Sequence, residues 1–362
     1  MLFVSSRDVT KKSHGGFQCT NRNYESFCAL FGRENVKVVD PTATLKENLF
    51  ARMKKWVNYM LGYSAGLTPA VMKELKREAK KADWVFIDSS GYGIIARKLR
   101  QGGYKGKIIS FFHNAELRIR KEQAKQHPGQ SWRIPLMYHN EKSAMQYSDI
   151  AIALNARDAA ELQEIYGQRE MEIIPISFID KAPAPSEAAL HERTQTPPLC
   201  LFIGNNWYPN IHGLRWFVDK VLDNVDIKLQ IVGTGMEPLR SQFQHPKIEF
   251  LGFVKDLDEV MAKADFMVSP IFLGSGMKVK TCESLMYGKN IIGTKEAFEG
   301  YEMDLRKVGA LCDNENDFTV AFKKFEMQPL EKYNRYCREM FVDRYSFEAT
   351  LRKFRKLVNG LD

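Results

Sequence analysis

Short β-rich runs alternate with amphipathic helical stretches along almost the whole sequence, a pattern typical of parallel sheets covered by helices. The stretch TPAVMKELKREAKKA illustrates a predicted helix, because Thr68 stands at its N-cap, Pro69 occupies the first helical position, and apolar residues recur at helical spacing. In the first half of the chain the predicted strands are LFVS from Leu2, VKVV from Val36, WVFID from Trp84, KIISFF from Lys107 and IAIAL from Ile150. This alternation predicts an α/β fold.

Two domains are expected, because 362 residues exceed what one ordinary core holds. A proline-containing stretch, residues 176–198, interrupts the alternation and marks the linker with its neighbourhood. Five further predicted strands follow: LCLFIG, IKLQIVG, KIEFLG, DFMVSP and NIIGT. We therefore expect two doubly wound domains, residues 1–180 and 181–345, whose ligands lie beyond the carboxyl ends of the strands. The last helix, residues 346–362 with Ser346 as its cap, is expected to pack back across the first domain.

The composition limits the classes of partner and compartment. The formal charge of +9 favours an anionic partner, and it leaves nucleic acid, a phosphorylated small molecule and an acidic membrane surface open. No segment approaches the roughly 18 apolar residues of a membrane-spanning helix, and MLFVSSRDVTKK is interpreted as a first strand rather than a secretion signal. The six cysteines show neither a C-x-x-C pair nor metal-site spacing, which favours reduced thiols in a cytoplasm.

One predicted strand exit, SPIFLGSGMKVKTCESLMYG, combines glycines, lysines and a glutamate. Gly274 and Gly276 lie where the strand turns into a helix, whose first N–H groups and dipole favour an anion. Lys278 and Lys280 add positive charge, and Glu283 shares a helical face with Lys280. A carboxylate repels phosphate but suits a pair of sugar hydroxyls, so the stretch predicts a nucleotide site. The alternative is a surface ion pair beside a tight turn.

Glycine loops also follow neighbouring predicted strands, where they would line the same cleft. FIGNNWYPN contains Gly204 and Asn205, and FLGFVKD contains Phe253 and Val254. Such loops can offer backbone groups to a base and to phosphates. The third loop, IVGTG, lacks the G-x-G-x-x-G spacing of a nicotinamide-binding turn, so the sequence does not predict a dehydrogenase.

The run from FIGNNWYPNIHGLRWFV through FLGFVKDLDEVMAKADFMVSPIFLGSGMKVKTCESLMYGKNIIGTKEAFEGYE resembles the donor-binding domain of the retaining GT-B glycosyltransferases, family four in the "glycosyl transferases group 1" superfamily. HGGFQCTNRNYESF is similar to the first loop of that family, and FFHNAE to the loop that carries its active-site histidine. The resemblance implies two Rossmann-like domains that face a cleft, the GT-B fold. It also implies transfer of a sugar, with anomeric retention, from a nucleotide-diphosphate sugar to a saccharide or lipid-linked saccharide acceptor.

The resemblance further implies roles for single residues. Lys280 would bind the donor diphosphate and His113 would lie against the transferred sugar, so these two are the predicted catalytic residues. Glu283 would hydrogen-bond the ribose hydroxyls. The predicted donor-binding residues are Gly15, Gly16, Gly204, Asn205, Phe253, Val254, Gly274, Ser275, Gly276, Lys278 and Glu283. Many relatives have a glutamate where this chain has Ser275, and a basic pair in the loop that reads GNNWYPNIHG here.

No metal or other cofactor is expected, because fixed cations and N–H dipoles in a partly dry cleft stabilise a departing diphosphate. Asp256 and Asp258 form the only D-x-D of this region and are interpreted as helix capping rather than as a metal–diphosphate site. Departure and attack on the same face of the sugar would account for retention, with the leaving phosphate helping to deprotonate the acceptor.

The favoured interpretation is a cytoplasmic, hexosyltransferase-like enzyme of bacterial surface polysaccharide or glycoconjugate biosynthesis. Basic runs from Lys73, Arg97 and Arg118 are interpreted mainly as solvated helix faces, although with interspersed aromatic residues they permit a peripheral contact with an anionic membrane. Nothing in the sequence resembles a nucleic-acid recognition module. Two alternatives stay open: a non-hydrolysing sugar-nucleotide epimerase of similar fold, and a catalytically silent relative that binds nucleotide or a partner protein.

Overall fold

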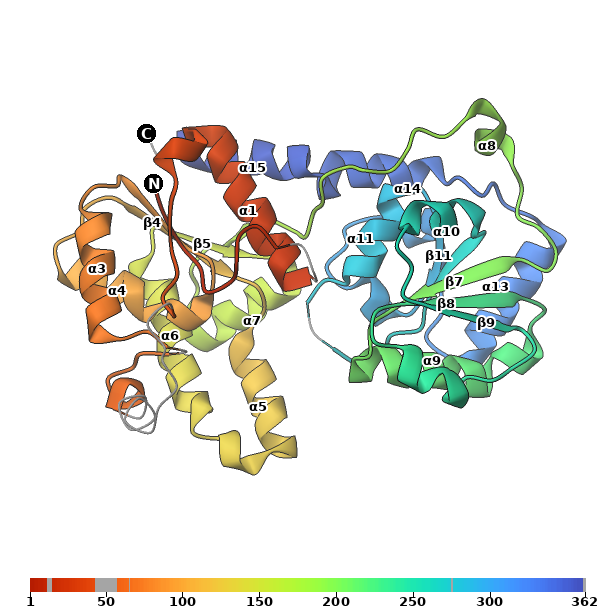
Figure 1. Cartoon of the computed structure of the whole chain (residues 1–362), viewed down its shortest axis with the longest axis horizontal. Coiled ribbons are helices and arrows are strands. Elements are labelled where there is room, and N and C mark those ends of the chain that lie inside the picture. Colours follow the sequence, from red (N-terminus) through yellow and green to blue (C-terminus); the bar gives the residue numbers. More distant parts are fainter. Residues whose placement is uncertain (12–14, 43–56, 65, 275, 361–362) are drawn as a thin grey trace. The chain divides into compact units, whose positions relative to one another are not determined.

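The computed structural model describes residues 1–11, 15–42, 57–64, 66–274 and 276–360, and the chain divides into two compact units (Figure 1). Unit 1 comprises Met1–Pro175 and Thr350–Asp362, and unit 2 comprises Ile176–Ala349. Each unit contains a six-stranded sheet in which neighbouring strands run parallel. The predicted α/β class with two parallel sheets is confirmed.

The sheet of unit 1 has the order β2-β1-β3-β4-β5-β6. Its strands are β1 (Leu2–Val4), β2 (Lys37–Val39), β3 (Trp84–Ile87), β4 (Lys107–Phe112), β5 (Ile150–Ala153) and β6 (Glu172–Ile173). The sheet of unit 2 has the order β9-β8-β7-β10-β11-β12. Its strands are β7 (Leu199–Ile203), β8 (Lys228–Val232), β9 (Ile248–Gly252), β10 (Phe266–Ser269), β11 (Asn290–Gly293) and β12 (Gly309–Leu311).

The strand order reverses beside the first strand of each sheet, between β1 and β3 in unit 1 and between β7 and β10 in unit 2. Ligands of open parallel sheets bind beyond the carboxyl ends of the strands at this switch point, because the connections on either side diverge there. The fold therefore gives each unit one favoured place for a polar site.

Ten of these strands were predicted, and the two short edge strands β6 and β12 were not. β6 has two residues and β12 has three, and each forms one edge of its sheet. A segment this short has no measurable hydrophobic period, so its sequence pattern does not distinguish it from a loop.

Helices flank both sheets (Figure 1). The helices of unit 1 are α1 (Gly15–Phe31), α3 (Pro69–Ala79), α4 (Ile94–Gln101), α5 (Glu116–Gln126), α6 (Arg133–Tyr147) and α7 (Ala156–Tyr166). Those of unit 2 are α8 (Glu187–His191), α9 (Tyr208–Lys220), α10 (Leu257–Lys263), α11 (Val279–Met286), α12 (Leu305–Val308), α13 (Glu315–Met327) and α14 (Arg335–Met340). The last helix, α15 (Phe347–Asn359), begins in unit 2 and continues into unit 1.

Different helices cover the two faces of the unit 1 sheet, because successive residues of a strand point to opposite faces. Leu2 and Val4 of β1 pack in one cluster with buried residues of α3 and α4. Phe3 belongs to the other face, and its ring centroid lies 6.4 Å from that of Phe27 in α1. The Phe354 ring of α15 lies 4.7 Å from that of Phe27, so α15 runs beside α1 (Figure 1). The predicted return of the C-terminal helix to the first domain is confirmed.

The two predicted helix caps also form. The hydroxyl of Thr68 accepts a hydrogen bond from the backbone N–H of Val71 at 3.2 Å, and Pro69 opens α3. At the start of α15 the hydroxyl of Ser346 accepts one from the N–H of Ala349 at 3.2 Å. Each cap satisfies an N–H group that the first turn of a helix leaves without a partner.

A buried arginine joins the places where the chain leaves and re-enters unit 1. Arg22 of α1 donates to the carbonyl oxygen of Pro175 at 2.8 Å and to the hydroxyl of Thr350 at 3.0 Å. Pro175 ends the first segment of unit 1, and Thr350 begins the second. Burying a guanidinium is costly unless it is hydrogen-bonded, so these contacts fix both segment ends against α1.

Unit 2 is held together by aromatic residues that connect its sheet to α9 and α13. The rings of Phe266 in β10 and Phe325 in α13 are 5.1 Å apart, and those of Phe217 in α9 and Phe318 in α13 are 5.4 Å apart. Pairs at such distances add to the hydrophobic stabilisation. All six cysteines of the chain are buried and free. Within the described ranges, no helix is both long and apolar enough to cross a membrane.

The packing of α15 predicts the effect of truncating Phe354, which is fully buried. Phe354→Ala should lower the free energy of unfolding by about 3–5 kcal/mol, because it removes buried surface and leaves a cavity. Urea unfolding would measure the change. The neighbouring Arg355 is exposed, so Arg355→Ala is the control, with an expected change within about 0.5 kcal/mol. Similar small effects for both variants would contradict the docking of α15.

Candidate functional site

Close backbone packing shapes the switch point of unit 2. A Cβ atom added to Gly213 of α9 would lie 1.8 Å from the carbonyl oxygen of Pro270, just after β10. A Cβ atom added to Gly233, after β8, would lie 1.5 Å from the carbonyl oxygen of Gly204, just after β7. Only glycine fits these two positions without a backbone shift. The loops after β7, β8 and β10 therefore converge at one edge of the sheet.

The glycine loop before α11 is held by a buried lysine. Gly274 has a φ of 124° and Gly276 a φ of 66°, conformations that glycine adopts readily. Lys278 is 7% exposed, and its ammonium donates to the carbonyl oxygen of Gly276 at 2.8 Å and to Oε1 of Glu296 at 2.7 Å. Its carbonyl oxygen accepts a hydrogen bond from the hydroxyl of Tyr301 at 2.7 Å. Lys278 thus fixes the loop, and its contact with a diphosphate stays a prediction.

Lys280 projects from the first turn of α11 into a different environment. Its ammonium donates to Oδ1 of Asn210 at 2.7 Å and lies 4.9 Å from the centroid of the Phe202 ring. Burial lowers the pKa of Lys280 to about 7, and the charge of Lys278 acts in the same direction, while Glu283 opposes both. An anion bound beside this amine would favour its charged form.

Glu283 lies one helical turn after Lys280, on the same face of α11. Burial raises the pKa of Glu283, and the charges of Lys181 and Lys280 partly offset this effect. Within the described part of the chain, no side chain or backbone group donates a hydrogen bond to its carboxylate. The carboxylate can therefore accept hydrogen bonds from hydroxyl groups of a ligand.

Two aromatic residues are exposed beside these loops. Trp207 is 51% exposed, and a Cβ atom added to Gly274 would lie 3.6 Å from its ring. Phe253 is 64% exposed, and its backbone N–H already donates to Glu237 at 3.0 Å. Val254 follows and is half-buried. Because the N–H of Phe253 is engaged, a base in this loop would meet its carbonyl group, the backbone of Val254 or the exposed ring.

The switch point of unit 1 is organised around a buried carboxylate. Asp88 follows β3 and accepts hydrogen bonds from the hydroxyls of Ser5 at 3.0 Å and Thr20 at 2.5 Å, and from the amide of Asn23 at 3.1 Å. Burial opposes its charge, but His113, whose Nε2 lies 3.7 Å from Oδ1, and the hydrogen bond from Thr20 lower the pKa of Asp88 below its usual range. An ionised carboxylate therefore lies beneath the ends of β1, β3 and β4.

His113 follows β4 and is 6% exposed. Its Nε2 lies 2.7 Å from the carbonyl oxygen of Asp88 and 2.7 Å from Nη1 of Arg7. These contacts favour opposite protonation states, because the carbonyl needs an N–H donor and the guanidinium needs an acceptor. Burial and Arg7 lower the pKa of His113, but Asp88 and the thiol of Cys19 outweigh them and raise it to about 9. We therefore treat His113 as cationic.

Arg7 links His113 to the predicted phosphate loop. α1 begins at Gly15, and a Cβ atom added to Gly16 would lie 3.3 Å from the Arg7 guanidinium. The start of α1, Arg7 and His113 are thus neighbours within unit 1. A helix N-terminus beside a guanidinium favours an anion, and the contact of Gly15 and Gly16 with a phosphate stays a prediction.

The structure brings together most of the predicted residues of each unit and adds partners that the sequence did not single out. Asn205 accepts a hydrogen bond from the Asn210 amide at 2.7 Å, and Asn210 also contacts Lys280. Asn210, Asp88 and Arg7 were missed, although Asp88 ends a predicted strand and Asn210 lies in a loop singled out for its glycine. Ser275 lies outside the described residues.

The D-x-D of unit 2 has the capping role that the sequence indicated. Asp256 is the N-cap of α10, and its carboxylate accepts the N–H of Asp258 at 2.9 Å. The carboxylate of Asp258 accepts the hydroxyl of Tyr287. Across the described ranges, no group of three His, Cys, Asp or Glu side chains is placed to hold a metal ion.

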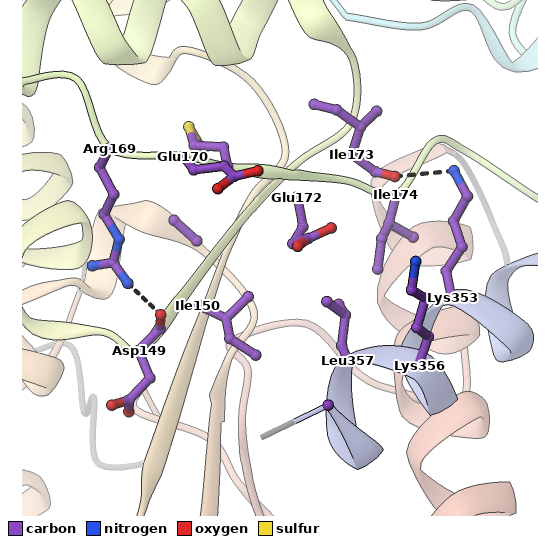
Figure 2. Close-up of a pocket in the computed structure, with 13 residues that line it drawn as sticks. Asp149, Ile150, Arg169, Glu170, Glu172, Ile173, Ile174, Lys353, Lys356 and Leu357 are labelled. Carbon is purple, nitrogen blue, oxygen red and sulfur yellow. Dashed lines mark hydrogen bonds between the residues drawn. The ribbon is translucent and has the colours of Figure 1, made fainter. Parts of the chain in front are cut away.

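A large cavity of about 810 Å³ lies elsewhere in unit 1, near α15 (Figure 2). It opens near Asp149 and Arg169, which precede β5 and β6, so it lies at the amino ends of these strands. Figure 2 shows that Arg169 donates to the carbonyl oxygen of Asp149 and Lys353 to that of Ile173. Its basic groups are thus largely occupied, and it lies at the edge opposite His113.

One family model matches a part of unit 2. Residues 197–325, which lie within unit 2, match the family model described as "Glycosyl transferases group 1". The matched range includes Asn210, Lys280 and Glu283. A search of curated proteins found no match to the sequence.

Solved structures share the fold of the whole chain. Sucrose-phosphate synthase from Thermosynechococcus elongatus is similar with a TM-score of 0.71 and 15% identity, over 99% of this chain and 98% of that one. Anabaena Alr3699/HepE in complex with UDP-glucose gives 0.65 and 12%, over 99% of each chain. A glycosyltransferase from Rickettsia africae gives 0.62 and 13%, over 98% and 96%. The chain has the fold of GT-B glycosyltransferases, as predicted.

The environment of His113 predicts how its charge responds to Asp88. Asp88→Asn should move the pKa of His113 from about 9 toward its ordinary value of 6.5, because the variant removes the buried negative charge. Titration of the imidazole C–H resonances by NMR would measure it, with His113→Gln identifying the signal. Exposed Asp83→Asn is the control and should leave the pKa unchanged. An unaltered pKa in Asp88→Asn would contradict the assignment.

The same raised pKa predicts the pH dependence of stability. A folded-state pKa above the unfolded value means that His113 stabilises the fold fully below about 6.5, and that this contribution is lost as the pH rises through about 9. The difference in the free energy of unfolding between the natural chain and His113→Gln should therefore shrink between pH 6.5 and 9. A constant difference across that range would contradict a charged His113.

Proposed function

We propose that the chain is a glycosyltransferase that moves a sugar from a nucleoside-diphosphate sugar to an acceptor hydroxyl, with retention of anomeric configuration. The observation that carries the proposal is the pairing of Lys280 and Glu283 on one face of α11 at the switch point of unit 2. Among the described residues, the amine contacts a neutral amide and an aromatic face, and the carboxylate accepts no hydrogen bond. The two groups suit a diphosphate and a ribose, respectively.

The remaining loops of unit 2 can complete a nucleotide site. Gly274 and Gly276 have positive φ in the loop before α11, and Gly204 and Asn205 lie on the neighbouring strand exit. Phe253 offers an exposed ring to a base. HepE, a protein of the same fold, was solved with UDP-glucose, which makes UDP the first nucleotide to test.

Unit 1 supplies a second set of cations. We assign the start of α1 with Arg7 to the distal phosphate of the donor, and His113 to the transferred sugar. A cationic imidazole can donate a hydrogen bond to a sugar oxygen, and Asp88 stabilises its charge. The guanidinium of Arg7 extends this positive charge to the glycine turn at Gly16.

The proposed chemistry follows from where charge develops. The bond between the anomeric carbon and the diphosphate oxygen breaks, and its electron pair leaves with the nucleoside diphosphate. Cations and helix N–H groups then stabilise that charge more strongly than water would. The acceptor oxygen bonds to the anomeric carbon from the same face, and its proton passes to the departing phosphate. In this proposal the protein cations fulfil the electrostatic role, and a metal ion is not required.

The acceptor is proposed to be a saccharide or lipid-linked saccharide, in the biosynthesis of a bacterial surface polysaccharide or glycoconjugate. Val57, Met60 and Leu61 are 57%, 88% and 55% exposed, and they form an apolar turn of unit 1 next to a described aromatic pair, Tyr59 and Trp132. Such a turn supports the proposed peripheral membrane contact on the cytoplasmic side.

UDP binding tests the nucleotide site directly. At 100 times its dissociation constant, UDP should stabilise the folded protein by about 2.7 kcal/mol, which a thermal-shift assay detects. Lys280→Met and Glu283→Ala should lose most of this shift, because each removes one group of the site. Glu326→Ala on α13 is exposed and is the control, with an unchanged shift. If UDP and the other nucleoside diphosphates stabilise none of these proteins, the proposal is wrong.

The two lysines of the loop should differ in effect. Lys278→Met should lower the melting temperature without ligand, because it leaves the carboxylate of Glu296 partly buried beside an apolar group. Lys280→Met should not, because burial of its charge costs stability rather than adding to it. Melting curves of the ligand-free proteins measure both. Equal destabilisation would argue against a binding role for Lys280.

The lowered pKa of Lys280 makes UDP binding sensitive to pH. Affinity should fall as the pH rises above about 7, because UDP binds the protonated amine and the free site loses its proton there. Binding should take up a proton in this range, which calorimetry in buffers of different ionisation enthalpy measures. Lys280→Arg keeps its charge and should show a flatter pH profile. Identical profiles for both proteins would contradict the role of Lys280.

A further inference from the structure

A basic groove in unit 1 has no part in the proposed donor site. It lies between α3 and the turn that follows α4, and its volume is about 770 Å³. We call it the α3 groove; its charged lining residues are Lys73, Glu74, Lys76, Arg77 and Lys80, and its other end is formed by Gly102, Gly103 and Tyr104. The basic residues of the groove thus all come from the run that begins at Lys73.

The positive charge of the α3 groove is largely uncompensated. Arg77 pairs with Glu74 at 3.8 Å and with Glu78 at 3.0 Å. Glu78 also binds Lys37 at 2.9 Å and Lys81 at 3.3 Å, so it has no capacity left for the groove. In the part of the chain that the structure describes, Lys73, Lys76 and Lys80 form no ion pair or hydrogen bond through their side chains. These three amines are available to an anionic ligand.

The three free lysines form a regular row. Lys73 and Lys76 lie on one face of α3, and Lys80 is the C-cap residue that follows in helical conformation, so the three side chains leave successive turns on one side. The groove beside them is bordered by Gly102, where an added Cβ atom would meet Cε of Lys76 at 3.5 Å, and by Gly103, where it would meet nothing within 4 Å. The half-buried ring of Tyr104 lies at the end of the row. This arrangement suits an extended ligand with repeated negative charges.

The position of the α3 groove separates it from His113. The C-terminal half of α3 precedes β3, and the turn at Gly102 precedes β4, so the groove lies at the amino ends of these strands. Asp88 and His113 follow the same two strands at their carboxyl ends. A ligand in the groove would therefore bind at the opposite edge of the unit 1 sheet from the proposed sugar-transfer residues.

We propose that the α3 groove binds an acidic glycan, a stretch of the acceptor or product polysaccharide that carries repeated carboxylates or phosphates. This rests on the proposed function as a glycosyltransferase. The groove would hold an already built part of the chain while its end reaches the transfer site. Binding there raises the effective concentration of the acceptor end without adding a contact to the donor.

The shape and composition of the groove favour a glycan over a membrane or a nucleic acid. Membrane binding uses apolar side chains that insert beside the basic ones, and the exposed large apolar residues of unit 1 in the described ranges, Val38, Val57, Met60 and Leu61, do not line the groove. Single-stranded nucleic acids use several aromatic rings as stacking platforms, whereas the groove offers one half-buried tyrosine. A sugar ring needs only one aromatic ring of this kind to stack on.

The test compares charge reversal in the groove with the same reversal elsewhere. The variant Lys76→Glu/Lys80→Glu changes two free lysines of the row, and the control Lys323→Glu/Lys324→Glu changes two exposed lysines of α13 in unit 2. Both have the same net charge. Binding of a size-defined oligogalacturonate is measured by calorimetry, with an uncharged malto-oligosaccharide of equal length as the ligand control. Vesicles containing phosphatidylglycerol and a single-stranded DNA are tested in parallel.

The natural chain should bind the oligogalacturonate, and the groove variant should bind it about tenfold or more weakly, because two attractive contacts become repulsive. The control should retain most of the affinity, and higher salt should weaken binding. Equal loss in the control would overturn the proposal, since it would reflect net charge alone. Groove-dependent binding of vesicles or DNA in preference to the glycan would also overturn it.

The UDP thermal shift separates this proposal from the donor site. Both double variants should keep the full UDP shift, because neither touches α11 or its partners. If UDP stabilises every protein but the groove variant binds the glycan normally, the groove proposal alone fails. If UDP stabilises none of them, the proposed function fails, whatever the glycan result.

Discussion

The site of unit 2 depends on the different environments of two lysines at the start of one helix. Lys278 and Lys280 are too close in sequence for both to be buried as charges without compensation, and the fold neutralises only one of them. Glu296 and a loop carbonyl satisfy Lys278, which fixes the glycine loop. Lys280 receives a neutral amide and an aromatic face instead, so its charge is disfavoured in the free protein. The lysine that orders the loop thus also prepares its neighbour for an anion.

The polar site of unit 1 is built around a buried negative charge rather than a buried positive one. The carboxylate of Asp88 accepts three hydrogen bonds at the switch point, and the cations Arg7 and His113 lie nearby. In both units the polar groups gather where the strand order reverses, because this is where a parallel sheet leaves room between diverging connections. The topology therefore determines where each site lies, and the long-range pairing of charges determines what each site can bind.

Sequence reasoning reached those parts of the fold and site that local patterns encode. Strands such as β4 and β10 contain apolar runs long enough to be predicted as strands. The spacing of Lys280 and Glu283 alone predicts that they share a helical face. The partners that define the chemistry are distant in sequence: Asn210 is 70 positions from Lys280, and Arg7 is 106 from His113. Lys278 shows what spacing cannot predict. Spacing makes Lys278 and Lys280 equivalent, and only the contact with Glu296 distinguishes them.

The basic runs of unit 1 show that sequence patterns also do not reveal which surface charges have distant partners. As a sequence, the run at Lys73 is an ordinary solvated helix face, since lysines of this spacing occur on many exposed helices. In the folded chain the buried carboxylate of Glu78 pairs with Lys37, Arg77 and Lys81. It therefore does not neutralise the row of Lys73, Lys76 and Lys80. Glycines at the end of α4 then leave an open groove beside the row. Part of the formal charge of +9 is therefore concentrated at the edge of the unit 1 sheet that lies opposite His113, and such a concentration attracts a polyanion rather than a single phosphate.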